Sequence, residues 1–325
     1  MIEVRDLVKT FEGFRALDGI SLTAPKGGVY GLVGPNGSGK STLLRHLAGV
    51  YRPDSGSVTF GGTAVYENAE LKSRIAYIPD DLYHFTSASI LDMKKFYRDM
   101  YPNFSEERYN KLKEVFELNE KKPIRRMSKG MQKQAAFWLA ISLHPDYLLL
   151  DEPVDGLDPV MRRQLWSILM ADLAEHGTTV LVSSHNLREL EDVCDHVGII
   201  DHGKMLVERS LSQLQDTVIK VQAVFEEEPD LTGVEILHES RTGRLRTLIL
   251  RSTQAELHAR MAVLQPVFYD VLPLTLEEIF IYELGGADYV VKEILLQPIP
   301  VAWEILWTEE PDELQFLGLQ RVGCD

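Results

Sequence analysis

The stretch that decides the fold is Gly34-Pro-Asn-Gly-Ser-Gly-Lys-Ser-Thr42, which follows the apolar segment Val29–Val33 and precedes a helical pattern. A glycine-rich loop in this place can wrap its backbone N–H groups around phosphate oxygens, and the start of the helix adds a partial positive charge. A second stretch, Tyr147-Leu-Leu-Leu-Asp-Glu152, reads as an apolar strand that ends in two carboxylates. Together they predict a site for a nucleoside triphosphate and magnesium.

The glycine-rich loop matches the pattern and the context of a Walker A loop. Lys40 supplies a point charge to the β- and γ-phosphates, Ser41 offers a hydroxyl to Mg²⁺, and Thr42 can reach the α-phosphate side. The backbone that surrounds the phosphates is expected to come from Gly34, Pro35, Asn36, Gly37, Ser38 and Gly39.

The two acids at the end of the second stretch have different expected roles. Asp151 can hold Mg²⁺ directly or through water. Glu152 is expected on the γ-phosphate side, where it acts as the general base for the attacking water. Two acids after an apolar run can also be an ordinary strand end, but beside a Walker A loop the pattern favours catalysis.

Composition excludes several classes of protein. A formal net charge of −15 argues against the basic surface of a duplex-DNA binder. The chain has no uninterrupted apolar run of the roughly 20 residues that a membrane-spanning helix needs, and its first residues lack the plan of a signal peptide. With Cys194 and Cys324 alone, it has no disulfide framework. We expect a cytoplasmic protein in which Cys194 is a small buried hydrophobe within a helical pattern.

The order of apolar patterns predicts the architecture of residues 1–215. Apolar runs at Tyr147–Leu150 and Thr179–Ser183, separated by a helix near Val160–Ala174, predict βαβ units and a parallel sheet buried on both faces. Residues 86–144 have helical spacing. Further strands are expected at Ile2–Leu7, Ala16–Ala24, Val29–Val33, Ser57–Phe60, Arg74–Ile78, Val197–Ile200 and Lys204–Glu208, and a helix at Thr42–Gly49.

The pattern restarts after about Leu214 and predicts a small α+β domain over residues 216–285. The remaining segment, residues 286–325, carries eight acidic and two basic residues. Its sequence leaves open whether it packs, binds a partner or stays unfolded. In the small domain we expect strands near Val218–Phe225, Leu245–Arg251 and Val267–Leu272, and helices near Thr253–Leu264 and Leu276–Glu283.

A third motif, Met127-Ser-Lys-Gly-Met-Gln132, lies between the two phosphate-site stretches and precedes an expected helix. Here the chain resembles the ATP-binding-cassette (ABC) ATPases, whose signature at this place is Leu-Ser-Gly-Gly-Gln. Ser128 and Gly130 match it, whereas Met127, Lys129 and Met131 differ. The resemblance implies that Ser128, Lys129, Gly130 and Met131 complete the ATP site of a second subunit. A plain helix N-cap would also explain Ser128.

The same resemblance implies roles at four further positions. Phe11 lies where an aromatic side chain stacks on adenine, and Asp158 belongs to Gly156-Leu-Asp158, which resembles the D-loop at the dimer interface. His185 resembles the switch histidine that contacts the γ-phosphate and the catalytic water. Asp80 stands where the family usually has a Gln that links Mg²⁺ to the helical subdomain, and its carboxylate is a plausible Mg²⁺ ligand.

We therefore expect an α/β P-loop NTPase with a mostly parallel core sheet, an N-terminal antiparallel β-subdomain, an inserted helical subdomain at about 86–144, and the small C-terminal α+β domain. Pro273-Leu-Thr-Leu-Glu-Glu-Ile-Phe280 resembles the extension of ABC-2-type exporter ATPases. The resemblance implies an ATP- and Mg²⁺-dependent ATPase subunit of a prokaryotic exporter. It would dimerise with a second ATPase subunit and dock near residues 80–89 on a separate transmembrane permease subunit, at the cytoplasmic face of the membrane.

Two alternatives belong to other functional classes. A soluble ABC ATPase acting on the ribosome or on nucleic acid would normally carry two cassettes or a long coiled coil, and neither pattern is present. A non-hydrolysing regulatory cassette would not need Glu152 and His185. We expect no nucleic-acid partner, and the sequence does not identify the transported substrate.

Overall fold

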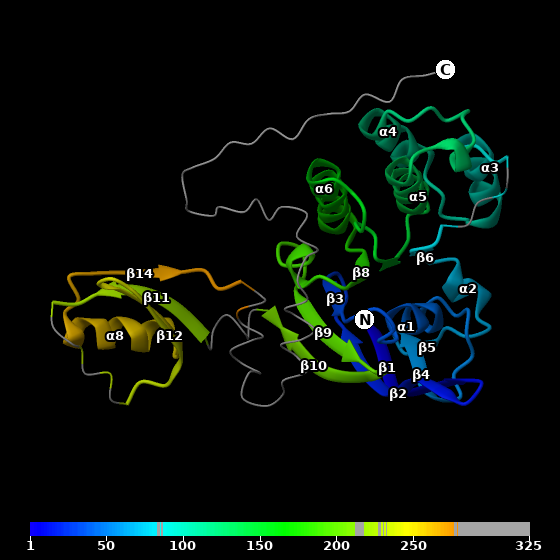
Figure 1. Ribbon diagram of the computed structural model, residues 1–325. Coiled ribbons are helices and arrows are strands. Elements are labelled where there is room, and N and C mark those ends of the chain that lie inside the picture. Colours follow the sequence, from blue (N-terminus) through cyan, green and yellow to red (C-terminus); the bar gives the residue numbers. More distant parts are fainter. Residues whose placement is uncertain are drawn as a thin grey trace, which may run out of the picture. The chain divides into compact units, whose positions relative to one another are not determined.

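The computed structural model describes residues 1–82, 85, 87–211, 218–226, 229, 231, 233–275 and 278 (Figure 1). Its central element is a six-stranded sheet in the order β10-β9-β3-β8-β7-β6. All neighbours are parallel except β10, which runs antiparallel to β9. The strands are β3 (Val29–Val33), β6 (Ile75–Ile78), β7 (Tyr147–Asp151), β8 (Thr179–Ser184), β9 (His196–Asp201) and β10 (Lys204–Ser210).

Every residue of β3, β7 and β8 is buried, as in a parallel sheet that is covered on both faces. Alternate side chains enter two different cores. Leu148 and Leu150 pack in the core that contains Trp138 and Leu165, whereas Leu149 packs in the core that contains Leu43. The predicted mostly parallel core sheet is therefore confirmed.

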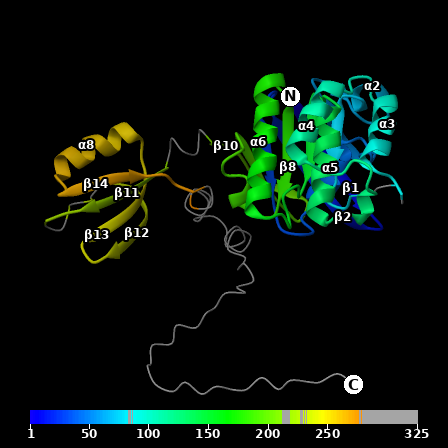
Figure 2. The ribbon, with the colours of Figure 1, turned by 90° about the horizontal axis from the view of Figure 1, so that it is seen from above.

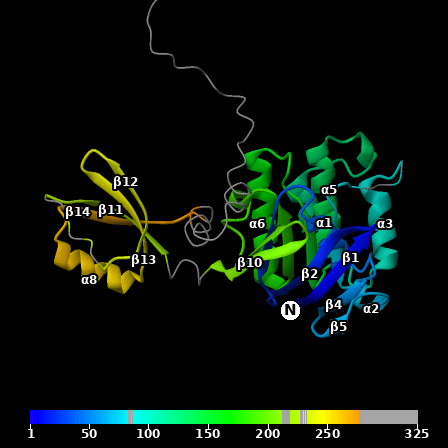
Figure 3. The same ribbon diagram turned by 60° about the horizontal axis from the view of Figure 1, so that its bottom comes forward.

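Helices α5 (Lys129–Ser142) and α6 (Pro159–His176) cover one face of this sheet, and α1 (Lys40–Leu47) covers the other (Figure 1). On the side of α1 lies a four-stranded antiparallel sheet in the order β2-β1-β4-β5, which is the predicted N-terminal β-subdomain (Figure 3). Its strands are β1 (Ile2–Phe11), β2 (Phe14–Ala24), β4 (Ser55–Phe60) and β5 (Thr63–Ala64), and the short helix α2 (Ala69–Lys72) follows them.

The predicted helical region is confirmed. It contains α3 (Ile90–Met100), α4 (Glu106–Phe116), a 3-10 turn η1 (Ile124–Arg126) and α5, which lie together in Figure 2. Each helix begins at a serine whose hydroxyl accepts a backbone N–H, which satisfies an otherwise free donor. The helices pack around Trp138, which is fully buried, stacks on Tyr109 at 4.6 Å between ring centroids and donates its indole N–H to the Tyr109 carbonyl.

The C-terminal part of the described chain forms its own four-stranded antiparallel sheet in the order β12-β13-β11-β14. Helix α8 (Gln254–Leu264) lies along one face of it, where Leu257 and Met261 pack on Val221 and Leu248 (Figure 2). The strands are β11 (Val218–Val224), β12 (Ile236–Thr242), β13 (Leu245–Arg251) and β14 (Phe268–Leu272).

The details that differ from the prediction include the unpredicted short elements β5 and α2 and three further points. Strand β12 was not predicted, because five of its seven residues are polar and exposed and it therefore carries no alternating pattern. Helix α1 begins at Lys40 rather than Thr42, since the helix starts inside the glycine-rich loop. Cys194 is buried as expected but lies in a loop and not in a helix. Apart from residue 278, the expected helix at 276–283 lies outside the described residues, and so does the acidic segment 286–325.

None of the helices in the described ranges combines the length and the apolar character that crossing a membrane requires.

Candidate nucleotide and magnesium site

The glycine-rich loop connects β3 to α1 and passes close to β9. A Cβ atom at Gly34 would come within 2.2 Å of the Ile200 carbonyl oxygen, so no larger residue fits. Gly39 has a φ of 110° and is the N-cap of α1, where no side chain caps the helix and no acidic residue lies in the first turn. The first N–H groups of α1 therefore remain directed at the loop, as they do where a helix binds phosphate.

A buried hydroxyl inside the loop also points to an anion. The Ser38 side chain is 2% exposed, and its Oγ has no hydrogen-bond partner among the described residues. Leaving a buried polar atom without a partner costs free energy, and a phosphate oxygen would supply the missing acceptor. The loop therefore fits a bound phosphate chain by the space it leaves and by its donors.

Lys40 connects this loop to the predicted general base. Its side chain is buried, and its Nζ donates to the carbonyl oxygens of Gly34 at 2.7 Å and Pro35 at 3.2 Å. The same Nζ forms an ion pair with Glu152 Oε1 at 3.2 Å, and both side chains are at most 10% exposed. The structure thus brings the predicted phosphate-binding cation and the predicted base together, although they are 112 positions apart in the sequence.

Asp151 is the last residue of β7 and is held by the neighbouring strand. In the parallel register Asp151 lies beside Ser183 of β8, and the Ser183 hydroxyl donates to Asp151 Oδ1 at 2.7 Å. The Ser183 Oγ also accepts the Glu152 backbone N–H at 3.1 Å. Ser183 therefore orients both acids. From the sequence alone Ser183 is expected to be an ordinary strand residue, and only the strand register reveals that it orients the two acids.

Glu152 and His185 lie in direct contact. Glu152 Oε2 is 2.9 Å from His185 Nδ1 and accepts the His185 backbone N–H at 3.3 Å. His185 follows β8, and its side chain is 41% exposed, whereas that of Glu152 is 10% exposed. This arrangement gives a nearly buried carboxylate with one oxygen on a lysine and the other on a histidine. Such a group can accept a proton from a water molecule positioned beside the imidazole.

Asp80 follows β6 and lies at the border of the same site. Its Oδ1 is 3.7 Å from the Nζ of Lys133 on α5. Burial raises the pKa of the Asp80 carboxyl; Lys133 lowers it, and the negative charges of Asp151, Asp81 and Glu152 raise it further. Asp80 is therefore close enough to Asp151, the predicted Mg²⁺ ligand, and Glu152, the predicted base, for their charges to act on it. Its role as a Mg²⁺ ligand stays a prediction.

Phe11, at the end of β1, is 37% exposed and forms an aromatic cluster with Tyr51, which follows α1. The two rings meet edge to face at 5.4 Å, and Lys9 Nζ lies 5.4 Å from the centroid of the Phe11 ring. An exposed ring that is held by a second ring suits stacking on a base. Tyr51 could not be identified from the sequence, since a single aromatic residue after a helix forms no pattern.

The signature segment opens helix α5 at the surface. Ser128 and Lys129 are exposed, and the Ser128 Oγ accepts the Met131 N–H at 3.3 Å as the helix N-cap. A Cβ atom at Gly130 would lie 3.3 Å from Leu157, so the signature packs on the predicted D-loop. Asp158 is exposed as well and caps α6 through its Oδ1. Both motifs therefore have a local capping role and also face solvent.

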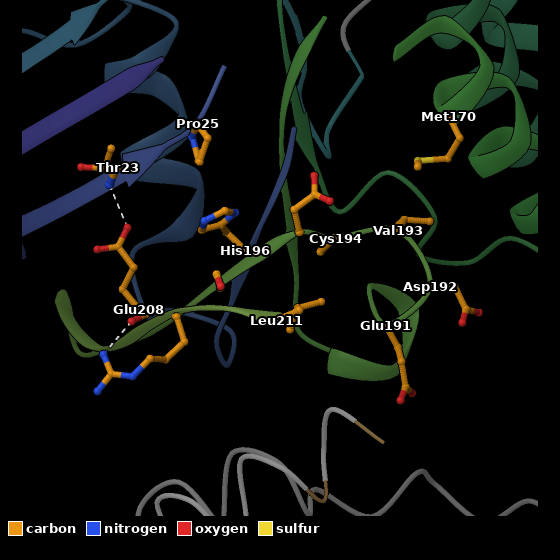
Figure 4. Close-up of a pocket in the computed structure, with 13 residues that line it drawn as sticks. Thr23, Pro25, Met170, Glu191, Asp192, Val193, Cys194, His196, Glu208 and Leu211 are labelled. Carbon is orange, nitrogen blue, oxygen red and sulfur yellow. Dashed lines mark hydrogen bonds between the residues drawn. The ribbon is translucent and has the colours of Figure 1, made fainter. Parts of the chain in front are cut away.

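A cavity of about 1010 Å³ lies elsewhere in the described structure and contains none of the predicted site residues (Figure 4). It is open, and Thr23 of β2 borders it, where the Thr23 N–H donates to Glu208 of β10 at 2.8 Å. Several acids line it, namely Glu191, Asp192, Asp195 and Glu208. The chemistry-bearing residues are thus grouped at strand ends and not in this large hollow.

Comparisons with known proteins show which proteins this chain is similar to. The family model described as ABC transporter matches residues 17–155. The ABC transporter ATP-binding protein YtrB of Bacillus subtilis is 32% identical over 88% of this chain and 99% of that protein. The Nod factor export ATP-binding protein I of Sinorhizobium fredii is 35% identical over 64% of this chain and 62% of that protein. A solved ATP-binding subunit of an ABC transporter superposes with a TM-score of 0.61 at 26% identity, over 66% of this chain and 92% of that one. The chain belongs to the family of ABC transporter ATP-binding proteins.

Proposed function

We propose that this chain hydrolyses ATP as the nucleotide-binding subunit of a prokaryotic exporter. The observation that carries the proposal is the contact chain from Lys40 through Glu152 to His185. These contacts join a phosphate-binding cation, a candidate base and a residue that orients the base. Hydrolysis requires all three groups, whereas nucleotide binding alone does not require a positioned base. The intact chain of contacts also argues against a non-hydrolysing regulatory role.

The roles follow from the contacts. Lys40 would move from its loop carbonyls and Glu152 onto the β- and γ-phosphates, which leaves the Glu152 carboxylate free to accept a proton from the attacking water. His185 keeps that carboxylate oriented through its contact with Oε2. Ser183 holds Asp151 and the backbone of Glu152 in fixed positions.

The donors fit magnesium. Ser41 and Asp151 would supply oxygen ligands, which a hard cation such as Mg²⁺ prefers. The buried Ser38 hydroxyl, which has no hydrogen-bond partner within the described part of the chain, supports an anion beside them. When bound, Mg²⁺ would neutralise charge on the β- and γ-phosphates. Asp80 is proposed as a further ligand, in the place of the usual glutamine.

The proposed active form is a dimer that holds ATP between two chains. The exposed Ser128 and Lys129 and the half-buried Gly130 lie at the start of α5, where N–H groups and the helix dipole favour a phosphate presented by a second molecule. Lys129 would add a positive charge that the usual glycine lacks. Asp158, next to this surface, is proposed to lie at the same interface.

The proposed membrane partner docks on an apolar patch whose residues follow Asp80 in the sequence. Phe85, Phe96 and Met100 are 54%, 42% and 63% exposed, and the two Phe rings meet at 5.9 Å. Exposed apolar groups of this kind mark interaction surfaces. A relative bears the name of an export protein, which supports an exporter that works at the cytoplasmic face of the membrane.

Two measurements test the proposal. The purified chain should release phosphate from ATP only with Mg²⁺, and Lys40→Ala should not. Phe96→Ser should reduce copurification with a multi-span membrane protein, while Val115→Ser, which changes an equally exposed residue (42%) of the same helical region, should not. If the parent chain hydrolyses ATP but no membrane protein copurifies with it, the soluble ABC class would be favoured instead.

A further inference from the structure

We propose that Lys133 is a positioning residue that ties helix α5 to the loop that carries the general base. The inference rests on the proposed function, because it assigns Lys133 a part in the same hydrolysis. Lys133 lies in the second turn of α5, and its side chain is 12% exposed. Its Nζ donates to the carbonyl oxygens of Glu152 at 2.8 Å and Asp155 at 2.9 Å, and lies 3.7 Å from Asp80 Oδ1.

The loop needs such a contact because its backbone is strained at Glu152, the proposed general base. Glu152 has a φ of 45°, a left-handed conformation that a non-glycine residue rarely adopts. Pro153 follows it, and a proline further restricts the residue before it. The Glu152 carbonyl accepts the Asp155 N–H at 3.3 Å, so the loop folds back on itself. An ammonium group has three donors, and Lys133 uses them where two carbonyls of this loop converge.

The neighbours of Lys133 do not share this role. Gln132 donates to the Met127 carbonyl at 2.9 Å, and Gln134 points to the Met161 sulfur at 3.5 Å. The first contact stabilises the start of α5, and the second supports its packing on α6. Lys133 instead reaches the acid after β6 and the loop after β7, so one side chain connects the signature helix with both.

This connection has a consequence for catalysis. The signature begins at Met127, six positions before Lys133, and the proposed dimer contact acts on that end of α5. A small displacement of α5 would move the Glu152 backbone directly and would change the distance between Lys133 and Asp80. Because misplacement of a catalytic group by about 1 Å can cost about 10²-fold in rate, the position of α5 would set the rate of hydrolysis.

The test compares Lys133→Met, Lys133→Gln and Lys133→Arg with the control Lys111→Met. Lys111 lies on α4 and pairs with the exposed Glu107 at 2.9 Å. We expect Lys133→Met to lower kcat by about 10–100-fold at an unchanged Kd for ATP. Hydrogen exchange of the amides at 152–158 should rise in this variant and stay at the parent level elsewhere. Lys133→Gln keeps a hydrogen-bond donor, so its kcat and its hydrogen exchange should lie between those of the parent and of Lys133→Met. Lys133→Arg should keep most of the parent's kcat.

A double mutant separates positioning from general stability. If Lys133 acts through Glu152, Lys133→Met should slow the residual hydrolysis of a Glu152→Gln protein by less than about twofold. A further loss as large as in the parent, or parental kcat and parental exchange in both Lys133→Met and Lys133→Gln, would overturn the inference. If the parent itself hydrolyses no ATP, the proposed function fails, whereas the exchange comparison still decides whether Lys133 holds the loop.

Discussion

Glu152→Gln is the most informative single change, because it removes a charge while it keeps the shape of the side chain. The carboxylate is nearly buried, with Oε1 at 3.2 Å from Lys40 Nζ and Oε2 at 2.9 Å from His185 Nδ1. A glutamine retains one acceptor oxygen but cannot take a proton from water. The backbone N–H bond to Ser183 is unaffected, so the loop should keep its position.

The expected magnitude follows from the loss of the base alone. Removing a positioned general base costs about 10²–10⁴-fold in rate. At about 1.4 kcal/mol per tenfold, this raises the barrier by about 3–5 kcal/mol. ATP binding should survive or tighten, since the mutation releases Lys40 from its ion pair and removes a negative charge that would face the γ-phosphate.

The assay is phosphate release at saturating MgATP, with size-exclusion chromatography of the same samples. We expect the slowed variant to accumulate as an ATP-bound dimer, because in the proposed dimer the two chains would separate only after hydrolysis. Glu175→Gln, which neutralises an exposed acid near the end of α6, is the control and should behave as the parent. Parental turnover in Glu152→Gln would refute the general-base role, and a monomer at high protein concentration with ATP would refute the shared site.

Four further outcomes are expected. Lys40→Ala should abolish MgATP binding, because it removes the buried cation of the loop, and unchanged affinity by calorimetry would contradict this. Ser128→Arg should bind ATP but not dimerise with it in size-exclusion chromatography; a retained dimer would leave Ser128 as a helix cap only. Asp80→Gln should stay active and Asp80→Ala should lose turnover but bind ATP, whereas an Ala variant with the parent's maximal rate and magnesium dependence would show that Asp80 is a solvated acid. The pKa of His144 is lowered below 6.5, first by partial burial and then by the charge of Arg108. The unfolded state therefore binds the proton more readily than the folded state. The free energy of unfolding should fall as the pH falls below about 6.5. His144→Asn, which tolerates the φ of 53° at this position, should flatten the fall of Tm between about pH 7 and 5, and an unchanged slope would exclude His144 as its source.

The phosphate site could be predicted because its parts are local in the sequence. Gly34 and Gly39 are needed by the backbone of one short loop, and Asp151 ends a strand whose apolar run is visible without the structure. The parallel sheet could be predicted for the same reason, since β7 and β8 are buried on both faces and read as continuous apolar runs. Each of these signals lies within about ten residues of chain.

The contacts between these parts could not be predicted without a strand order. Strand β8 lies between β3 and β7, and this order places Ser183 beside Asp151 and His185 beside Glu152. A serine inside an apolar strand has no pattern of its own, so its hydrogen bonds follow only from the register. Strand β12 was missed for a related reason, because a mostly exposed edge strand gains its structure from pairing with β13 and not from burial.

Asp80 shows how a departure from a family pattern acquires a physical meaning once its surroundings are known. In sequence it is an acid in place of a neutral glutamine, and a third negative charge near Asp151 and Glu152 should be unfavourable. In the structure Lys133, 53 positions away in the printed numbering, places an ammonium group 3.7 Å from it. Because the other acceptors of Lys133 are backbone carbonyls, which every residue has, the residue types in the loop do not predict the contact. Asp80 and Lys133 therefore belong together. The Lys133 ammonium group that binds the loop after β7 also offsets the added negative charge of Asp80.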